Sequence, residues 1–255
     1  MPVELTYRDE FAIITLNRPE ALNALSFQIL RDISAALDEV ETSDARALLF
    51  IGAGDKAFCA GADIKEFANR PLAQAKRDAE YGQRTFARLD TFPISSVAII
   101  NGYAFGGGFE LASACTFRLA TPNAKMGLPE IKLGLIPGYG GTIRLPRLIG
   151  EARALEIIMT GRTVDAEEAA RIGMVNRVVE GDPLEAGMAY AREFTGYSLP
   201  VLNLARDAVK RALDNPVWEG LKAEADLNTL AFQTEDSVEG AAAFTEKRKA
   251  DFRDR

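Results

Sequence analysis

The sequence contains no histidine among its 255 residues, and this absence restricts the chemistry open to it. Without imidazole there is no Ser-His-Asp triad, no Cys-His pair and no histidine-built metal site. Any acid or base that works near neutral pH is therefore Asp, Glu, Lys, Tyr or Cys.

Other scarcities exclude further classes of protein. Two cysteines are too few for a disulfide framework, and no apolar run is long enough to span a membrane. The opening Met-Pro-Val-Glu-Leu lacks the basic and apolar segments of a signal peptide. Lys and Arg number 30 against 37 Asp and Glu, so the net charge of −7 disfavours nucleic acid binding. We therefore expect a cytoplasmic protein that binds neither membranes nor nucleic acids.

The N-terminal half alternates strand-like and helix-like segments. Short apolar runs predict strands over residues 11–16, 47–51 and 97–100. Apolar residues recurring every three or four positions predict a helix after the first strand; they are Leu22, Leu25, Ile29, Ile33, Leu37 and Val40. The Ala-rich, charged segment 71–90 predicts another helix. Strands separated by helices indicate an α/β core.

The chain changes character after residue 151. Helical patterns dominate there, at 152–159, 184–193, 201–213, 218–232 and 237–247. We expect a core domain over residues 1–195 and a helical region over 196–255. No nucleotide-binding fingerprint is present, because Gly106-Gly107-Gly108 is not followed by Gly-Lys-Ser/Thr.

The three glycines at 106–108 directly precede a predicted helix start and leave the backbone bare. Free N–H groups and the positive end of the helix dipole would converge there and suit a developing negative oxygen. The alternative is that these glycines only permit close packing of a turn.

A second candidate is the segment 57–64, where small residues flank Gly61 and Asp63 can open a helix. The Ala62 N–H would then point into a cleft at the end of a strand. Cys59 lies nearby, but without a histidine to activate it we interpret it as a buried core residue, not a nucleophile.

Two glutamates stand among apolar neighbours, Glu110 between Phe109 and Leu111, and Glu130 after Pro129. Such carboxylates are either surface groups near helix ends or buried groups with raised proton affinity that can act as acid or base. The sequence leaves both interpretations open and does not show that the two side chains face each other.

Taken together and in order, several segments resemble the enoyl-CoA hydratase/isomerase (crotonase) family over essentially the whole chain. The segments are Leu16-Asn17-Arg18-Pro19, Asn23-Ala24-Leu25, Phe58-Cys59-Ala60-Gly61-Ala62-Asp63, Asn101-Gly102 with Gly106-Gly107-Gly108-Phe109-Glu110, Gly127-Leu128-Pro129-Glu130, and Pro137-Gly138-Tyr139-Gly140-Gly141. The resemblance implies an α/β spiral of ββα repeats with a helical C-terminal region that forms trimers, commonly paired into hexamers.

The resemblance also implies roles for single residues. Ala62 and Gly107 resemble the two backbone donors of an oxyanion hole for a thioester carbonyl, and Glu110 and Glu130 resemble the catalytic glutamates of hydratases. The expected substrate contacts are at Ala24, Ala60, Asp63, Ile64, Gly106, Pro129, Gly138, Tyr139, Lys249 and Phe252. No metal and no cofactor are expected, because coenzyme A is part of the substrate.

The activity implied is hydration of a trans-2-enoyl-CoA to a 3-hydroxyacyl-CoA, as in β-oxidation of fatty acids. A double-bond isomerase of the same family is the alternative, and the presence of both glutamates favours the hydratase. Some relatives bind RNA, but the net charge argues against that, and a non-catalytic scaffold is the remaining alternative.

Two features bear on the substrate. Tyr139 stands where alanine is frequent in the family, and Ile143 replaces a common glutamine, so Tyr139 either narrows or polarises the acyl pocket or simply packs. The basic cluster Lys247-Arg248-Lys249, close to Phe252, is either part of a neighbouring subunit's CoA site, as the resemblance implies, or a solvated helix end.

Overall fold

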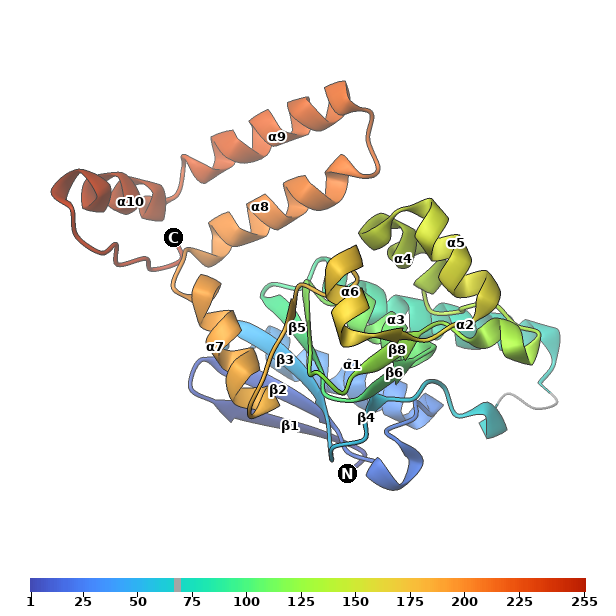
Figure 1. The fold of residues 1–255 in the computed structure, drawn as a ribbon. Coiled ribbons are helices and arrows are strands. Elements are labelled where there is room, and N and C mark those ends of the chain that lie inside the picture. Colours follow the sequence, from blue (N-terminus) through green and yellow to red (C-terminus); the bar gives the residue numbers. More distant parts are fainter. Residues whose placement is uncertain (67–69) are drawn as a thin grey trace. The chain divides into compact units, whose positions relative to one another are not determined.

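The chain forms two compact units in the structure, a computed structural model that describes residues 1–66 and 70–255. The first unit is Met1–Ala189 and the second is Tyr190–Arg255. The expected boundary after residue 195 coincides with the end of helix α7 (Pro183–Thr195), whereas the two units divide within that helix. Each unit is described by itself below (Figure 1).

Two sheets form the frame of the first unit. The larger has the order β1 (Val3–Arg8), β2 (Phe11–Leu16), β3 (Ala47–Gly52), β5 (Ser95–Ile100), β7 (Phe117–Ala120) and β10 (Arg177–Val178). The smaller has the order β4 (Ala57–Cys59), β6 (Tyr103–Phe105), β8 (Lys125–Gly127) and β9 (Val164–Asp165). Neighbouring strands are parallel except at the β1–β2 and β8–β9 pairs.

The connection of the strands repeats along the chain. Each of the pairs β3–β4, β5–β6 and β7–β8 places its first strand in the larger sheet and its second in the smaller. Helix α2 (Leu72–Ala87) follows the first pair, α3 (Gly107–Ala114) the second and α4 (Gly141–Ile149) the third. This confirms the predicted α/β spiral of ββα repeats. Because successive turns stack, the segments that follow β4, β6 and β8 come next to one another.

A buried asparagine joins two turns of the spiral. The Asn101 side chain donates to the carbonyls of Gly52 at 2.8 Å and Gly54 at 2.9 Å, and accepts the N–H of Gly52 at 3.1 Å. Asn101 follows β5 and Gly52 ends β3, so this one side chain satisfies backbone groups where both strands turn towards the smaller sheet.

The helix after β2 is shorter than its apolar spacing predicts. Helix α1 spans Phe27–Glu41 and is capped by the preceding Ser26, whose hydroxyl accepts the N–H of Ile29. Leu22, predicted on the helix, adopts a left-handed conformation at φ 52°, and Leu25 pairs with Ala62. The prediction was wrong here because the chain turns back at these residues, which gives the half-buried Leu22 and the buried Leu25 the same apolar spacing as a helix face.

The other predicted helices are confirmed with small shifts at their ends. They are α2, α5 (Glu151–Thr160), α7, α8 (Leu199–Ala212), α9 (Val217–Ala231) and α10 (Glu235–Glu246), and the short α6 (Ala166–Ile172) adds to them. The strands of the smaller sheet were not predicted, since two or three residues are too few for a periodic pattern. No helix in the described parts of the chain has the length and apolar character needed to cross a bilayer.

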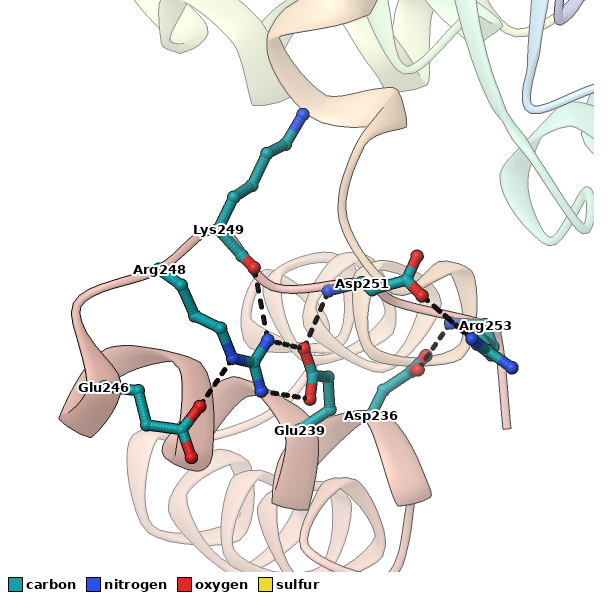
Figure 2. Close-up of polar contacts among 7 residues, drawn as sticks. All are labelled: Asp236, Glu239, Glu246, Arg248, Lys249, Asp251 and Arg253. Carbon is teal, nitrogen blue, oxygen red and sulfur yellow. Dashed lines mark hydrogen bonds and ion pairs between the residues drawn. The ribbon is translucent and has the colours of Figure 1, made fainter.

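In the second unit, two carboxylates of α10 hold the C-terminal tail (Figure 2). The Glu239 carboxylate accepts from both terminal nitrogens of Arg248, at 2.5 and 2.8 Å, and from the N–H of Asp251 at 2.8 Å. Asp236 accepts the N–H groups of Arg253 and Asp254. These bonds fix the segment that carries two predicted substrate contacts, and Figure 2 shows the Lys249 side chain extending away from this network.

Candidate active site

The start of α3 presents an unpaired backbone donor. Gly106 precedes the helix at φ 50° and ψ −126°, a conformation open to glycine but not to residues with a Cβ. Its own N–H donates to the Gly127 carbonyl at 3.0 Å, which ties it to the next turn of the spiral. The following N–H, that of Gly107, is the first of the helix and has no acceptor within the described part of the chain.

Ala62 presents a second such donor. The Leu25 N–H donates to the Gly61 carbonyl at 2.7 Å, and the Asp63 N–H donates to the Leu25 carbonyl at 2.8 Å. In this parallel bridge the N–H of Ala62 points away from Leu25, and no described residue accepts from it.

The two donors lie on backbone segments in close approach. A Cβ built on Gly106 would lie 3.9 Å from the Gly61 Cα, and a Cβ built on Gly61 would lie 3.1 Å from the Phe105 carbonyl oxygen. Larger residues would push the segments apart. The structure thus brings together the predicted oxyanion-hole residues, and both N–H groups are available to an anionic oxygen.

The Glu110 carboxylate is buried beside this pair, with only 2% of the residue exposed. Its Oε1 accepts the backbone N–H groups of Tyr139 at 2.7 Å and Gly141 at 2.8 Å. The pKa of Glu110 is raised to about 7, chiefly by burial and also by the Glu130 charge, while the two N–H groups and Arg144 act in the opposite direction. Of the two sequence interpretations of Glu110, the buried one is confirmed.

Glu130 begins the 3-10 helix Glu130–Leu133 and is half-buried. Its Oε2 is buried and makes no hydrogen bond with any described residue, while its Oε1 lies 3.0 Å from where a Cβ on Gly106 would be. Burial also raises the pKa of this carboxyl. A buried oxygen without a partner is costly unless water or a substrate meets it, so this atom points to a site for a polar ligand.

Tyr139 packs against the same corner. Its ring lies 5.7 Å from that of Phe86 in an edge-on arrangement, and its Cδ2 is 3.3 Å from where a Cβ on Gly107 would be. The side chain is buried, and burial raises the pKa of the phenol. The structure therefore places Tyr139 beside both the oxyanion pair and Glu110.

Most other predicted contacts lie around this centre. Pro129 precedes Glu130, and the Gly138 carbonyl accepts from Gln83 at 2.9 Å. The N–H of Ala60 donates to the Leu22 carbonyl, which brings Ala60 next to the turn that carries Ala24. Asp63 pairs with Arg18 at 3.0 Å and Ile64 is 60% exposed, so this side of the site is open to solvent.

Three expectations have different outcomes. Lys249 and Phe252 lie in the second unit, and their part in substrate binding stays a prediction. Cys59 is fully buried, and burial raises the pKa of its thiol to about 12, which fits a core residue. The described residues include no group of three or more Cys, Asp or Glu side chains that could hold a metal, and the absence of a cofactor stays a prediction.

Sequence reasoning missed residues that act through their backbone. The Gly141 N–H orients Glu110, and Leu25 orients the Ala62 N–H, yet neither contributes a reactive side chain. The sequence signal for Gly141 was the glycine pair at 140–141. The structure explains the need for glycine, since a Cβ on Gly141 would lie 3.1 Å from the Glu110 carboxylate.

This spiral, with its N–H pair and glutamate pair on adjacent turns, has the crotonase fold. The chain superposes on the crystal structure of an enoyl-CoA hydratase from Bacillus anthracis with a TM-score of 0.94 and 36% identity, over 100% of both chains. The sequence model of the enoyl-CoA hydratase/isomerase family matches residues 7–255. The chain therefore belongs to the enoyl-CoA hydratase/isomerase family.

Relatives with assigned names are similar over nearly their full length. A probable enoyl-CoA hydratase of Mycobacterium tuberculosis is 44% identical over 250 residues, which cover 97% of this chain and 96% of the relative. A crotonyl-CoA hydratase of Syntrophomonas wolfei is 40% identical over 251 residues, again 97% and 96% of the two chains.

Proposed function

We propose that the protein is an enoyl-CoA hydratase, which adds water across the 2,3 double bond of a trans-2-enoyl-CoA to give a 3-hydroxyacyl-CoA. The observation that carries this proposal is the buried, unpartnered Oε2 of Glu130 next to Glu110, whose pKa is raised to about 7. Two carboxyl groups with raised pKa values are the acid and base that a histidine-free hydratase needs.

The N–H groups of Ala62 and Gly107 bind the thioester oxygen. C3 of the conjugated thioester becomes electrophilic when negative charge moves to that oxygen, and two fixed donors stabilise the charge. In comparable sites, loss of one donor costs about 3 kcal/mol of transition-state stabilisation. These donors are backbone groups held by the spiral, so they need no rearrangement during the reaction.

The glutamate pair handles the protons. The water oxygen bonds to C3, one water proton passes to an ionised carboxylate, and the enolate carbon C2 takes a proton from a protonated carboxyl. The mutual repulsion of Glu110 and Glu130 favours a pair that holds one proton between them near neutral pH, which provides both forms at once.

The test is hydration of crotonyl-CoA, followed as loss of the enoyl-thioester absorbance, by wild type, Glu110→Gln, Glu130→Gln and the double variant. Each single change should lower kcat by ~100 to 10,000-fold, the usual contribution of a general acid or base. The double variant should be little worse than the poorer single one, because a water held by two groups is lost when either fails. Full activity in Glu130→Gln would contradict the paired-glutamate mechanism.

A double-bond isomerase gives a different result. One carboxylate suffices to move a proton between two carbons, so one Gln variant would keep most isomerase activity. Wild type that isomerises a 3-enoyl-CoA but hydrates no 2-enoyl-CoA would overturn the hydratase proposal. Filter binding with RNA at physiological salt tests the remaining binding alternative, for which we expect no retention.

We further propose that the subunits assemble as trimers or dimers of trimers. The support is a second unit rich in exposed apolar side chains, among them Val209, Trp218, Leu221 and Phe244. Large apolar side chains exposed in such number are typical of protein interfaces. Light scattering after size exclusion gives the mass directly, and a monomer at micromolar concentration would contradict the proposal.

A further inference from the structure

Tyr139 occupies the space next to the glutamate pair on the side of helix α2. Its backbone N–H is bonded to Glu110, and its ring lies so close to Gly82 that a Cβ there would be 2.4 Å from two ring carbons. Gly82 is thus the position that makes room for the ring. The ring fills the volume between the start of α3 and the middle of α2.

The face of α2 that meets this ring is continuous. Asp78, Gly82 and Phe86 are spaced by four residues, so they lie on one side of the helix, and all three are buried. Phe86 holds the ring edge-on. Asp78 lies one turn of α2 before Gly82, on the side of the helix that meets the ring.

Beyond Asp78 the protein opens into a cavity of about 520 Å³. Its lining includes Glu66, Arg70 and Asp78, whose charges act on the Tyr139 phenol together with that of Glu110. Tyr139 therefore lies between Glu110, to which its N–H donates, and the face of α2 whose Asp78 lines this cavity.

The cavity is charged, with Arg31, Arg70, Arg77 and Arg84 in its lining against two carboxylates. Arg70 pairs with Asp78 and its guanidinium lies 4.2 Å from the centre of the Phe27 ring. A hydrocarbon chain in this cavity would displace water from charged groups without replacing their hydrogen bonds, which is unfavourable. The cavity therefore offers a long acyl chain little binding energy even where it has the volume.

We propose that Tyr139 determines acyl-chain length by closing the site behind C3, so that the enzyme acts on short 2-enoyl thioesters of about four carbons. The inference rests on the proposed hydratase function. With the thioester oxygen on the Ala62 and Gly107 donors and C3 at the glutamates, the chain beyond C3 runs into the Tyr139 ring. Tyr139 is a specificity-determining residue, and its ring, not its hydroxyl, sets the limit.

The experiment compares kcat/KM for 2-butenoyl-, 2-hexenoyl- and 2-decenoyl-CoA in wild type, Tyr139→Phe and Tyr139→Ala. Wild type should prefer the four-carbon substrate, and Tyr139→Phe should keep the same preference because the ring remains. Tyr139→Ala should raise the ratio of hexenoyl to butenoyl activity about tenfold, the usual effect of added methylenes that find apolar space. Decenoyl-CoA should gain little, because its end would enter the charged cavity.

Tyr81→Ala is the matched control. Tyr81 is a tyrosine on the same helix that lines the cavity beyond Asp78, so a chain stopped at Tyr139 never reaches it. Its removal should leave the substrate ratios of wild type unchanged. A purely structural effect of removing Tyr139 lowers activity on all substrates together, whereas the proposal requires a change in their ratio.

Several results would overturn the inference while leaving the proposed function intact. They are equal wild-type activity on butenoyl- and decenoyl-CoA, an unchanged ratio in folded Tyr139→Ala, or a shifted ratio in Tyr139→Phe. If Tyr139→Ala does not fold, Tyr139→Leu carries the test, with the same direction and a smaller shift. Wild type that hydrates none of the thioesters would instead refute the proposed function on which the inference rests.

Discussion

The N–H of Gly141 donates to the Oε1 of Glu110 over 2.8 Å and holds this buried carboxylate in place. A side chain at position 141 would meet Leu128, Pro137 and Glu110 itself, at 2.9 to 3.1 Å. Glycine is therefore required for the bond. The backbone fixes the direction of the carboxylate, while burial sets its proton affinity, so orientation and acidity are controlled by different parts of the structure.

The raised pKa of Glu110 gives a stability prediction. Its pKa is about 7 in the folded protein, and a carboxyl in an unfolded chain has a pKa near ~4.3. The folded state binds the proton more tightly than the unfolded state does. The stabilisation of the fold that results is complete below the pKa of the unfolded state and is lost as pH rises through about 7. Glu110→Gln, which stays neutral, should gain stability relative to wild type between pH 5 and pH 8.

The expected gain is at most about 3 kcal/mol, since each unit of pKa shift corresponds to ~1.4 kcal/mol. Urea unfolding of both proteins at the two pH values measures it. The difference in unfolding free energy between the two proteins reports on Glu110 alone, because carboxyls whose pKa is lowered, such as Glu239, contribute equally to both. Parallel stability curves for wild type and variant would show that the carboxyl has an ordinary pKa.

Neighbouring glycines at the start of α3 should respond differently to substitution. A Cβ at Gly107 would lie 3.2 Å from Leu25 Cδ1 and 3.3 Å from Tyr139 Cδ2, so Gly107→Ala shifts side chains and the N–H donor only slightly. We expect a folded protein with ~100-fold lower kcat, the effect of misplacing one oxyanion donor. Gly107→Val adds two methyl groups and should abolish most activity.

Gly108→Ala is the contrasting variant. Its Cβ would lie 2.0 Å from the Cys59 carbonyl oxygen, a backbone atom that cannot move without separating α3 from β4. Thermal unfolding should therefore show a large loss of stability in Gly108→Ala and a small one in Gly107→Ala. Near-normal turnover in folded Gly107→Val would show that Gly107 is not a donor.

Asn101 should matter for stability although it is remote from any proposed chemistry. Asn101→Ala leaves the carbonyls of Gly52 and Gly54 without their donor, which should cost about 2 to 3 kcal/mol. Asn123→Ala, at an exposed position in a related turn, should change stability by less than ~0.5 kcal/mol. Equal losses in the two variants, measured by chemical denaturation, would contradict the role given to Asn101.

Lys249 tests the expected contribution of the tail to coenzyme A binding. Its ammonium pairs with no carboxylate among the described residues, whereas Arg248 beside it is bound by Glu239. Lys249→Ala should raise KM for CoA thioesters several-fold with little change in kcat, since a phosphate contact acts equally in ground and transition states.

Lys222→Ala, which removes the same charge from α9, is the control and should leave KM unchanged. A point variant is a sharper test than deleting residues 244–255. That deletion would also strip Asp236 and Glu239 of the tail groups they bind. An unchanged KM in Lys249→Ala would show a solvated helix end, the other interpretation of this cluster.

Several features followed from local sequence alone. Continuous apolar runs identified β2, β3 and β5 because strands buried on both faces show no alternation. The regular spacing after residue 151 identified the later helices. The lack of histidine directed attention to the glutamates, and the motif order indicated the family that the comparisons confirmed.

Only the tertiary structure decided how these residues act together. Glu110 and Glu130 are twenty positions apart with similar neighbours, yet one is enclosed and bonded twice by backbone while the other keeps a buried oxygen without a partner. Burial and charge depend on which turns of the spiral stack, and local sequence does not encode that. Likewise Leu25 has the spacing of a helix residue but aligns the Ala62 N–H, because long-range pairing outweighs local propensity.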